Sequence, residues 1–446
     1  MTRPLFVLLV ALTAAFPSQA LSPDLLALRE SMLAGYYAAS PYSSMWYWAD
    51  WYVDNTWTGE TLGTLDAPFT NIQTAIVMAG ASNFAANTIN VRDTGIPYEG
   101  PLVFRNMNAL RLRGYGGRPT IRYSGAVGAH TIMSGTNYNL ASAYACMPPA
   151  QVGLENLRIE NHTTASGEWY CADVQTWVTW EYKYTGMPER LRYGITNVIF
   201  DGAGRNSGVR LRDLDQGHMV PWGIPYANFH TSLVQGCVFA RCKTGVRIMS
   251  MQCARVAYNW FISNDLGVTA VEMTNGPYKR AYDTIHVGYN VFAWCAQDGI
   301  RGGIYSNLVY YNNTFFACGG TGTLFNAGAF ASYGKAGLYN NIFYANGAAW
   351  VADPADTNLL AAGHNMYWAN AATTGWEAFG TPAYFTNPLF VSVDYGDPTL
   401  FLCPELNGPA DVPGFGGATF LGARAPIPEP AAAVVACLLL LLPRRR

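Results

Sequence analysis

The segment Cys237-Val-Phe239, followed by Cys242, begins a short pattern that recurs through the second half of the chain. In each copy a small or polar residue precedes an apolar pair ending in an aromatic ring, and a Cys or Asn follows three residues later. Successive rings lie 22, 31, 23, 28 and 24 positions apart, and a period of this length is typical of a solenoid. The other copies are Trp260-Phe261 with Asn264, Asn290-Val-Phe292 with Cys295, Asn313-Thr-Phe315 with Cys318, Asn341-Ile-Phe343 with Asn346, and Asn365-Met-Tyr367 with Asn370.

A second signal follows the rings at a short distance: a glycine and then a run of alternating residues, which predicts a short strand leaving a turn. A helical solenoid would need apolar faces at helical spacing over about ten residues, and these runs are shorter. The sequence therefore predicts a parallel β-solenoid in which each repeat is one coil. The runs are Gly208-Val-Arg-Leu211, Gly245-Val-Arg-Ile248, Gly267-Val-Thr-Ala270 and Gly299-Ile-Arg-Gly302.

Equivalent residues of stacked coils lie about 4.8 Å apart, so the recurring rings are expected to form an internal stack. The residue three positions after each ring would form a ladder at a corner, because an Asn amide can bond the coils above and below it. Cysteines would fill the same place as small, weakly polar groups. The expected ladder is Cys242, Asn264, Cys295, Cys318, Asn346 and Asn370.

These repeats resemble the right-handed parallel β-helix of the pectate-lyase-like group. Tyr52-Val-Asp-Asn55 and the expected helix Phe69–Ala81 are similar to the entry of exported β-helices, where a capping helix precedes the first coil. The segment from Asn387 to Ala423 is similar to their closing coil. The resemblance covers residues 50 to 423 and implies an all-β, single-stranded right-handed parallel β-helix with an N-terminal capping helix. We expect its coils to begin at Ile89.

The chain divides into four parts. Residues 1–20 have the charged start, apolar centre and small-residue end of a signal peptide. Residues 21–60 form an aromatic-rich leader, whose rings either cap the open end of the solenoid or stack on sugars. Residues 61–423 form the β-helix, with insertions expected at 163–192 and 213–230. Residues 424–446 form a terminal tail.

The tail resembles the PEP-CTERM sorting signal of Gram-negative bacteria. It contains a Pro-Glu-Pro motif, an apolar run of 12 residues and an arginine cluster. The resemblance implies sorting by exosortase, transient contact with the inner membrane, and a location at the cell surface or outside the cell. An ordinary tail anchor is the alternative, although the run is shorter than the ~20 residues that span a bilayer. The motif residues are Pro428, Glu429, Pro430, Arg444, Arg445 and Arg446.

Composition excludes several classes of partner. The net charge is -2 and only 13% of the 446 residues are charged, which argues against nucleic acid. The nine cysteines contain no Cys-x-x-Cys spacing, so no metal site is predicted. Cys295 and Cys318 would be stacked neighbours, either as free thiols or as a disulfide, and Cys146 and Cys171 are a second candidate pair. We expect a monomer without a cofactor.

Arginines are expected to form a row on the outer side of the second strand. Arg210, Arg212, Arg247 and Arg301 alternate with inward apolar residues. Guanidinium forks match carboxylate or sulfate groups, which predicts a groove for an acidic polysaccharide. The alternative is a solvated face paired with Asp213, Asp265 and Asp298. Aromatic residues expected to help bind the sugar are Trp169, Trp177, Trp180, Trp222 and Tyr226.

Two enzymatic mechanisms suit this fold. A lyase would abstract a proton beside a uronate carboxylate, with Ca²⁺ in some cases, and a glycoside hydrolase would need two carboxyl groups about 5–9.5 Å apart. Asp213-Leu-Asp215, Gly217-His-Met219 and Arg247-Ile-Met249 each depart from the catalytic motifs of polygalacturonases. The candidate catalytic set is Asp213, Asp215, His218, Arg247, Asp298 and Arg301.

The sequence thus favours an exported surface or matrix protein that binds polysaccharide along its flank. A polysaccharide lyase or glycoside hydrolase is the alternative. A purely structural or adhesive rod is the third reading.

Overall fold

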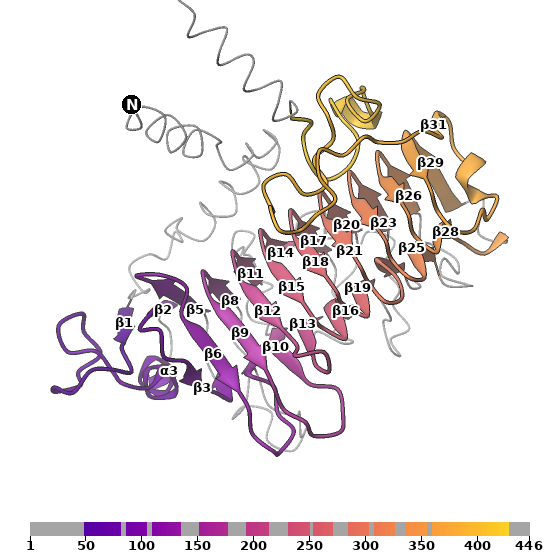
Figure 1. Cartoon of the computed structure of the whole chain (residues 1–446). Helices are drawn as coiled ribbons and strands as arrows, with labels where there is room; N and C mark the ends of the chain where they lie inside the picture. The colour runs from indigo at the N-terminus through magenta and orange to yellow at the C-terminus, as the bar shows by residue number, and fades with distance from the viewer. Residues whose placement is uncertain are drawn as a thin grey trace, which may run out of the picture.

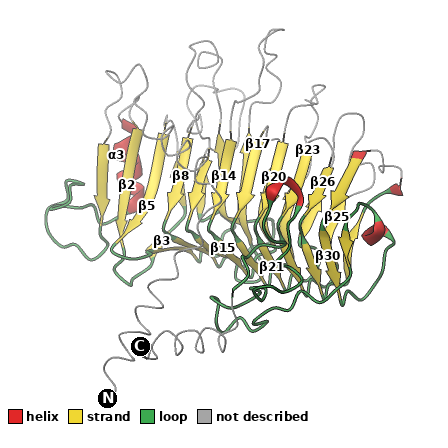
Figure 2. Ribbon diagram, turned by 90° about the horizontal axis from the view of Figure 1, so that it is seen from above, coloured by secondary structure: helices red, strands yellow, loops and turns green. Residues whose placement is uncertain are grey.

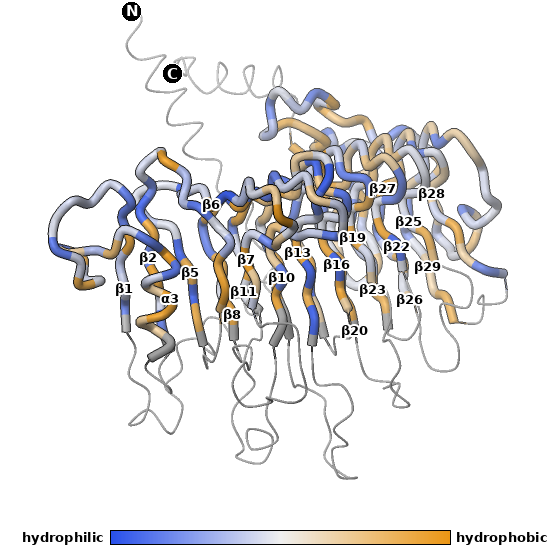
Figure 3. Tube along the Cα trace, turned by 90° about the horizontal axis from the view of Figure 1, so that it is seen from below, coloured by the Kyte–Doolittle hydropathy of each residue, from blue (hydrophilic) through white to orange (hydrophobic). Residues whose placement is uncertain are grey.

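The computed structural model describes residues 49–81, 86–104, 109–134, 151–176, 193–213, 231–249, 253–270, 284–302, 307–325, 336–354 and 359–427. Its strands form three parallel sheets that run the length of an elongated molecule (Figure 1). Each coil contributes one strand to each sheet in turn, so the chain is a parallel β-helix, as predicted. Along β6 (Thr120–Tyr123), the buried residues Ile121 and Tyr123 alternate with the half-buried polar residues Thr120 and Arg122. The trace coloured by hydropathy shows hydrophobic and hydrophilic residues mixed along the strands (Figure 3).

Sheet A contains, in spatial order, β1 (Ala49–Val53), β2 (Ala86–Arg92), β5 (Ala109–Tyr115), β8 (Gln151–Glu155), β11 (Tyr193–Thr196), β14 (Thr231–Gln235), β17 (Cys253–Ala257), β20 (Thr284–Gly288), β23 (Asn307–Tyr311), β26 (Ala336–Tyr339) and β29 (Leu360–Gly363). Sheet B contains β3 (Tyr98–Glu99), β6 (Thr120–Tyr123), β9 (Arg158–Asn161), β12 (Ile199–Asp201), β15 (Val238–Ala240), β18 (Trp260–Ile262), β21 (Val291–Ala293), β24 (Thr314–Phe316), β27 (Ile342–Tyr344), β30 (Asn365–Trp368) and β31 (Ala383–Tyr384). Sheet C contains β4 (Leu102–Phe104), β7 (Ile132–Ser134), β10 (Tyr170–Thr176), β13 (Ser207–Asp213), β16 (Thr244–Met249), β19 (Leu266–Ala270), β22 (Ile300–Gly302), β25 (Thr321–Phe325) and β28 (Ala348–Val351).

The N-terminal end is capped by the helix α3 (Ile72–Ala81). Asn71 ends the preceding turn, and its side-chain oxygen accepts hydrogen bonds from the backbone N–H groups of Gln73 and Thr74 at 2.7 and 3.3 Å. The predicted capping helix is therefore confirmed, with its start set by this N-cap. The coils begin earlier than Ile89, because β1 in the leader already pairs in parallel with β2.

The predicted ring stack lies in the interior of the β-helix. Ring centroids of neighbours are 4.9, 4.8, 4.6, 4.9, 4.8 and 5.5 Å apart, and the rings are nearly parallel. Such pairs contribute about 0.5–1.5 kcal/mol each beyond their burial. The stack consists of Phe200, Phe239, Phe261, Phe292, Phe315, Phe343 and Tyr367.

Two corner ladders hold the coils in register. In the predicted ladder, the Asn264 amide oxygen accepts the backbone N–H of Cys242 at 2.7 Å, and Asn346 does the same for Cys318 at 2.9 Å. Both cysteines are free thiols, as are Cys295 and Cys171, so the disulfide alternatives are not realised there. A second ladder occupies a position that the sequence had shown only as part of the repeat. Hydrogen bonds of 3.0–3.1 Å between side-chain amides join Asn259, Asn290, Asn313, Asn341 and Asn365.

The C-terminal segment 385–427 departs from the prediction of a closing coil. It leaves the stack after β31 and crosses the outer face of sheet B (Figure 2). That face is apolar in this half of the molecule, and the segment covers it with Phe401, whose ring lies 5.3 Å from Trp294 and 5.9 Å from Trp260. Burial of these rings explains why the segment packs across the sheet. We call residues 385–427 the strap.

Candidate functional site

Many of the predicted site residues lie outside the described part of the chain. Asp213 is the last residue of β13, and nothing is described of its side chain. The sorting signal Pro428, Glu429, Pro430, Arg444, Arg445 and Arg446 and the site residues Asp215, His218, Trp177, Trp180, Trp222 and Tyr226 lie outside the described residues. The residues that can be placed are Arg210, Arg212, Arg247, Asp298, Arg301 and Trp169.

The predicted arginine row exists on the outer face of sheet C. Arg210 pairs in register with Arg247, Arg247 with Thr269, and Thr269 with Arg301. Arg212 lies two residues after Arg210 in the same strand, opposite Met249. The intervening apolar residues, among them Val209 and Val246, are fully buried. The predicted coil alignment is therefore correct to the residue.

Carboxylates neutralise the row, and those that pair with Arg210, Arg212 and Arg247 were not among the predicted partners. Asp173 in β10 is buried and accepts hydrogen bonds from Arg210 at 2.7 Å (Nε) and 2.5 Å (Nη2). Arg212 Nη2 and His130 Nε2 each lie 3.5 Å from the same carboxylate. Burial alone would raise the pKa of Asp173, but the hydrogen bonds and charges of Arg210 and its neighbours lower it below the usual value.

A second, more exposed ion pair lies beside the first. Arg247 Nη1 donates to both oxygens of Glu168 at 2.5 and 2.6 Å, and to the Tyr170 hydroxyl at 3.2 Å. The Tyr170 hydroxyl in turn donates to Glu168 at 2.5 Å. The Arg247 side chain is 27% exposed and that of Glu168 is 36% exposed, so solvent reaches this pair. Arg210 lies 4.7 Å from the Tyr170 ring centroid, a cation–π contact that ties the two pairs together.

Trp169 places an aromatic ring next to these ion pairs. Its ring centroid lies 5.4 Å from that of His130. It also lies over Gly128, where a Cβ would come within 2.0 Å of the indole, so this approach requires glycine. His130, Glu168, Trp169, Tyr170, Asp173, Arg210, Arg212 and Arg247 together are called the sheet-C cluster below.

Asp298 and Arg301 belong to a different arrangement. Arg301 donates to Asp298 Oδ2 at 3.0 Å (Nε) and 2.5 Å (Nη2). Asp298 Oδ1 accepts the backbone N–H and hydroxyl of Thr321 in the next coil at 2.9 and 2.8 Å. The Asp298 carboxylate thus joins two coils. The alternative prediction, a face whose arginines pair with nearby aspartates, is confirmed for Arg301. This pair does not join Arg247 in one site, because a whole coil, that of Thr269, separates them.

The protonation states of the cluster limit its chemistry. His130 Nδ1 accepts the Tyr170 N–H at 3.0 Å, so this nitrogen is not available as a base. Burial lowers the pKa of His130 despite the nearby Asp173 charge. Burial would raise the pKa of Glu168, but the hydrogen bonds from Tyr170 and Arg247 lower it overall. Burial and the Glu168 contact raise the pKa of Tyr170. At neutral pH the cluster presents a carboxylate, guanidinium groups and a phenol.

Glu168, Tyr170 and Asp173 were not predicted as site residues, because residues 163–192 were expected to form an insertion. The stretch 170–176 is instead strand β10. The signal was present: Ala172-Asp-Val-Gln alternates as Val209-Arg-Leu-Arg does, and these residues pair in register. Trp169, predicted to bind substrate, does lie in the cluster. Among the described residues, no group of three metal-ligating side chains is found.

No family model matches the sequence, and no curated protein matches it. Nine chains of solved structures match, among them a rhamnogalacturonan lyase with a TM-score of 0.38 and 10% sequence identity. That match covers 81% of this chain and 96% of that chain. No helix within the described ranges is long and apolar enough to cross a membrane.

Proposed function

We propose that this protein binds polysaccharide on the outer face of sheet C, at the sheet-C cluster. The observation that carries the proposal is the solvent-accessible Glu168–Arg247 ion pair beside Trp169 and Tyr170. Sugar hydroxyls need donors and acceptors held in fixed positions, and a ring supplies apolar contact. The ion pair supplies both kinds of polar group from side chains that are already held in place.

Binding fits the cluster better than catalysis does. A general base works best when its pKa is near the operating pH, and the pKa values of His130 and Glu168 are both lowered. Asp173 is held by Arg210 and is buried, so it is not a second carboxyl group for a hydrolase. The arginines are paired with Asp173, Glu168 and Asp298, so this face is not a strongly cationic groove. A neutral or weakly acidic polysaccharide suits it.

The proposal includes the location. A signal peptide at residues 1–20 would export the chain, and the PEP-CTERM-like tail at 424–446 would direct sorting by exosortase to the surface of a Gram-negative cell. The motifs in the sequence support this part. Export is tested by expressing the full chain in such a host and locating it in cell fractions, with and without Pro428→Ala and Glu429→Ala.

A polysaccharide lyase remains the second candidate, and the contact between Arg247 and Tyr170 favours it. A guanidinium can neutralise a uronate carboxylate, the Glu168 carboxylate would take the proton beside it, and the protonated Tyr170 phenol would deliver a proton to the leaving oxygen as the double bond forms. Lyase activity would produce unsaturated ends that absorb in the ultraviolet. New reducing ends without that absorbance would indicate a hydrolase instead.

The binding test uses the purified protein and a panel of neutral and uronate-containing polysaccharides, with rhamnogalacturonan among them. Arg247→Ala and Trp169→Ala should each weaken binding by about tenfold, which corresponds to ~1.4 kcal/mol. Arg92→Ala is the matched control, because Arg92 forms a similar pair with buried Asp54 at 2.8 Å in sheet A. Unchanged binding by both cluster variants would refute the proposal. Product absorbance is followed in the same samples, with and without Ca²⁺.

A further inference from the structure

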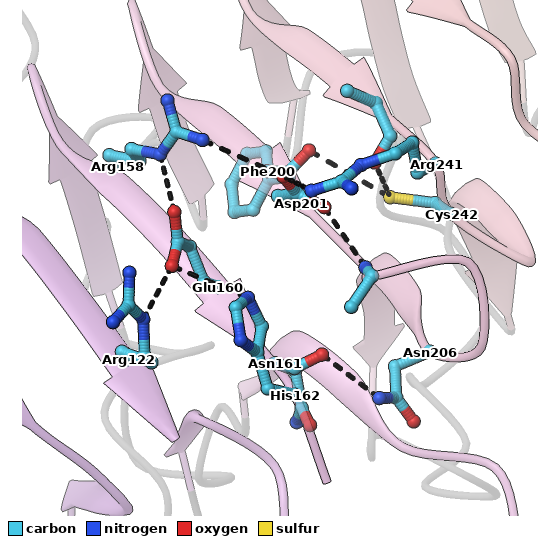
Figure 4. A network of polar contacts seen from close by, with 12 residues as sticks. Arg122, Arg158, Glu160, Asn161, His162, Phe200, Asp201, Asn206, Arg241 and Cys242 are labelled. Carbon is cyan, nitrogen blue, oxygen red and sulfur yellow. Dashed lines mark hydrogen bonds and ion pairs between the residues drawn. The ribbon is translucent and has the colours of Figure 1, made fainter. Parts of the chain in front are cut away.

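The outer face of sheet B is divided into two halves of different chemistry. One outward row runs Arg122, Glu160, Asp201, Ala240 and Ile262 through successive coils. From Ile262 onward the row is apolar, and the strap packs on it. The coils before Ala240 carry charged side chains, which Figure 4 shows at close range. We call Arg122, Arg158, Glu160, His162, Asp201 and Arg241 the sheet-B network.

Two carboxylates hold three guanidinium groups in this network. Glu160 accepts hydrogen bonds from Arg122 Nε at 2.6 Å and from Arg158 Nε at 2.5 Å. Arg158 Nη2 also lies 3.6 Å from Asp201, which accepts a hydrogen bond from Arg241 Nη2. Arg158 therefore links the two carboxylates across neighbouring coils (Figure 4). Burial would raise the pKa of Glu160, but Arg158 and Arg122 lower it, so this group is charged at neutral pH.

Burial differs sharply between the two signs of charge. The side chains of Glu160 and Asp201 are each 5% exposed, whereas those of Arg122, Arg158 and Arg241 are 36%, 40% and 60% exposed. Each guanidinium has several N–H donors and uses only part of them on the carboxylates. No other hydrogen bond of these three groups occurs among the described residues. The remaining N–H donors of the three guanidinium groups therefore face solvent, and the carboxylates of Glu160 and Asp201 lie buried beneath them.

We propose that the sheet-B network binds the oxyanion groups, carboxylate or sulfate, of an acidic polysaccharide that lies across the coils. Guanidinium groups pair bidentately with such anions, and the buried carboxylates hold the three forks in place before the ligand arrives. This site is separate from the sheet-C cluster, which presents an exposed carboxylate together with its arginines. It does not depend on binding at the sheet-C cluster.

The extent of the network favours a chain over a single small anion. Arg122 and Arg241 lie three strand spacings apart, about 14 Å at ~4.8 Å per coil. Exposed Lys243 lies just past Arg241 in the chain and adds a positive charge at that end. Exposed Glu99 is the register neighbour of Arg122 and limits the site at the other end. One small ion cannot contact all three guanidinium groups at once, whereas an extended polyanion can.

The test uses full-length protein and two matched pairs of polymers. Dextran sulfate is compared with dextran, and polygalacturonate with its methyl ester, by calorimetry at low and moderate salt. The charged member of each pair should bind more tightly than the uncharged member, and only the charged member should lose affinity as the salt concentration rises. Arg122→Gln with Arg241→Gln should weaken binding at least tenfold and make its salt dependence shallower by about two counterions. Arg92→Gln, outside the network, should bind as wild type does.

Replacement of Arg122 and Arg241 removes partners of the buried Glu160 and Asp201 carboxylates, which destabilises the fold. A variant that removes one positive and one negative charge together is therefore tested as well. Arg241→Gln with Asp201→Asn removes one ion pair as a unit, and should fold while binding the charged polymers several-fold more weakly. Equal binding of dextran sulfate and dextran would overturn the proposal, and so would wild-type affinity and salt dependence in the arginine variants. If inorganic sulfate binds as tightly as dextran sulfate, the proposal that the site binds an extended chain across several coils is wrong. Arg247→Ala should leave this binding unchanged, which separates the two sites.

Discussion

Arg210 holds the Asp173 carboxylate through two hydrogen bonds, one to each oxygen, although the residues lie 37 positions apart in the chain. The Asp173 side chain is 1% exposed and that of Arg210 is 16% exposed. Water therefore contributes little to solvating the carboxylate, and the guanidinium takes its place. The pair joins β10 to β13 and supports the position of Tyr170, over whose ring Arg210 lies.

Removal of one partner of this pair should be costly. Arg210→Ala removes both of these hydrogen bonds from a buried carboxylate, although Arg212 stays 3.5 Å from it, and should lower the free energy of unfolding by about 3 kcal/mol. Because the pKa of Asp173 is lowered in the folded state, its stabilisation is present above its unfolded pKa of about 3.9 and is lost at lower pH. Denaturant unfolding measures both effects. The double variant Arg210→Met with Asp173→Leu should cost much less, and equal losses in the two variants would contradict this account.

Replacement of one asparagine in the interior ladder should destabilise the protein. Asn313 is fully buried, and its side-chain oxygen accepts the backbone N–H and the amide N–H of Asn290, each at 3.1 Å. Asn313→Ala removes the acceptor of the Asn290 backbone N–H, at about 1–3 kcal/mol, whereas the Asn290 amide still donates to the carbonyls of Val256 and Gly288. Asn370→Ala, at the half-buried end of the other ladder, should cost less because water can replace the amide. Thermal unfolding measures the loss of stability in both variants, and a larger loss for Asn370→Ala than for Asn313→Ala would contradict this prediction.

His286 should make stability depend on pH in the weakly acidic range. Burial, together with the Arg255 charge, lowers its pKa to about 4. The unfolded chain binds the proton near pH 6.5, so the unfolded state takes up more protons and stability falls as the pH drops from about 6.5 to about 4. The loss amounts to about 3 kcal/mol over this window. His286→Leu should remove this part of the pH profile in denaturant titrations, and an unchanged profile would show that another group is responsible.

The strap should detach when its central ring is removed. Phe401 is fully buried against the outer face of sheet B, so Phe401→Ala should cost about 3–5 kcal/mol locally. The expected result is faster proteolysis within residues 385–427 and greater binding of a hydrophobic dye. Phe385→Ala is the control, because Phe385 is 60% exposed at the start of the strap. Equal proteolysis of the two variants would show that Phe401 does not anchor the strap.

The site could be predicted only in part. The alternation around Arg210 and Arg247 placed both side chains on one outer face, and the register of β13 and β16 agrees. Their partners were missed although Asp173 alternates with apolar residues as Arg210 does, because Glu168 and Asp173 lie in a stretch whose spacing departs from the repeat. The sheet-B network was also missed, since Glu160 and Asp201 are isolated acids in sequence and meet only when two neighbouring coils stack.

The sequence by itself determined the coil: the ring stack, the corner residues and the strand alternation all follow from a period that repeats in the chain. These features are local, because each repeat makes the same contacts with the next one. The tertiary structure alone decided which charges meet and where the strap lies. Both depend on contacts between residues far apart in sequence, such as Arg247 with Glu168 and Phe401 with Trp294, which no periodic pattern encodes.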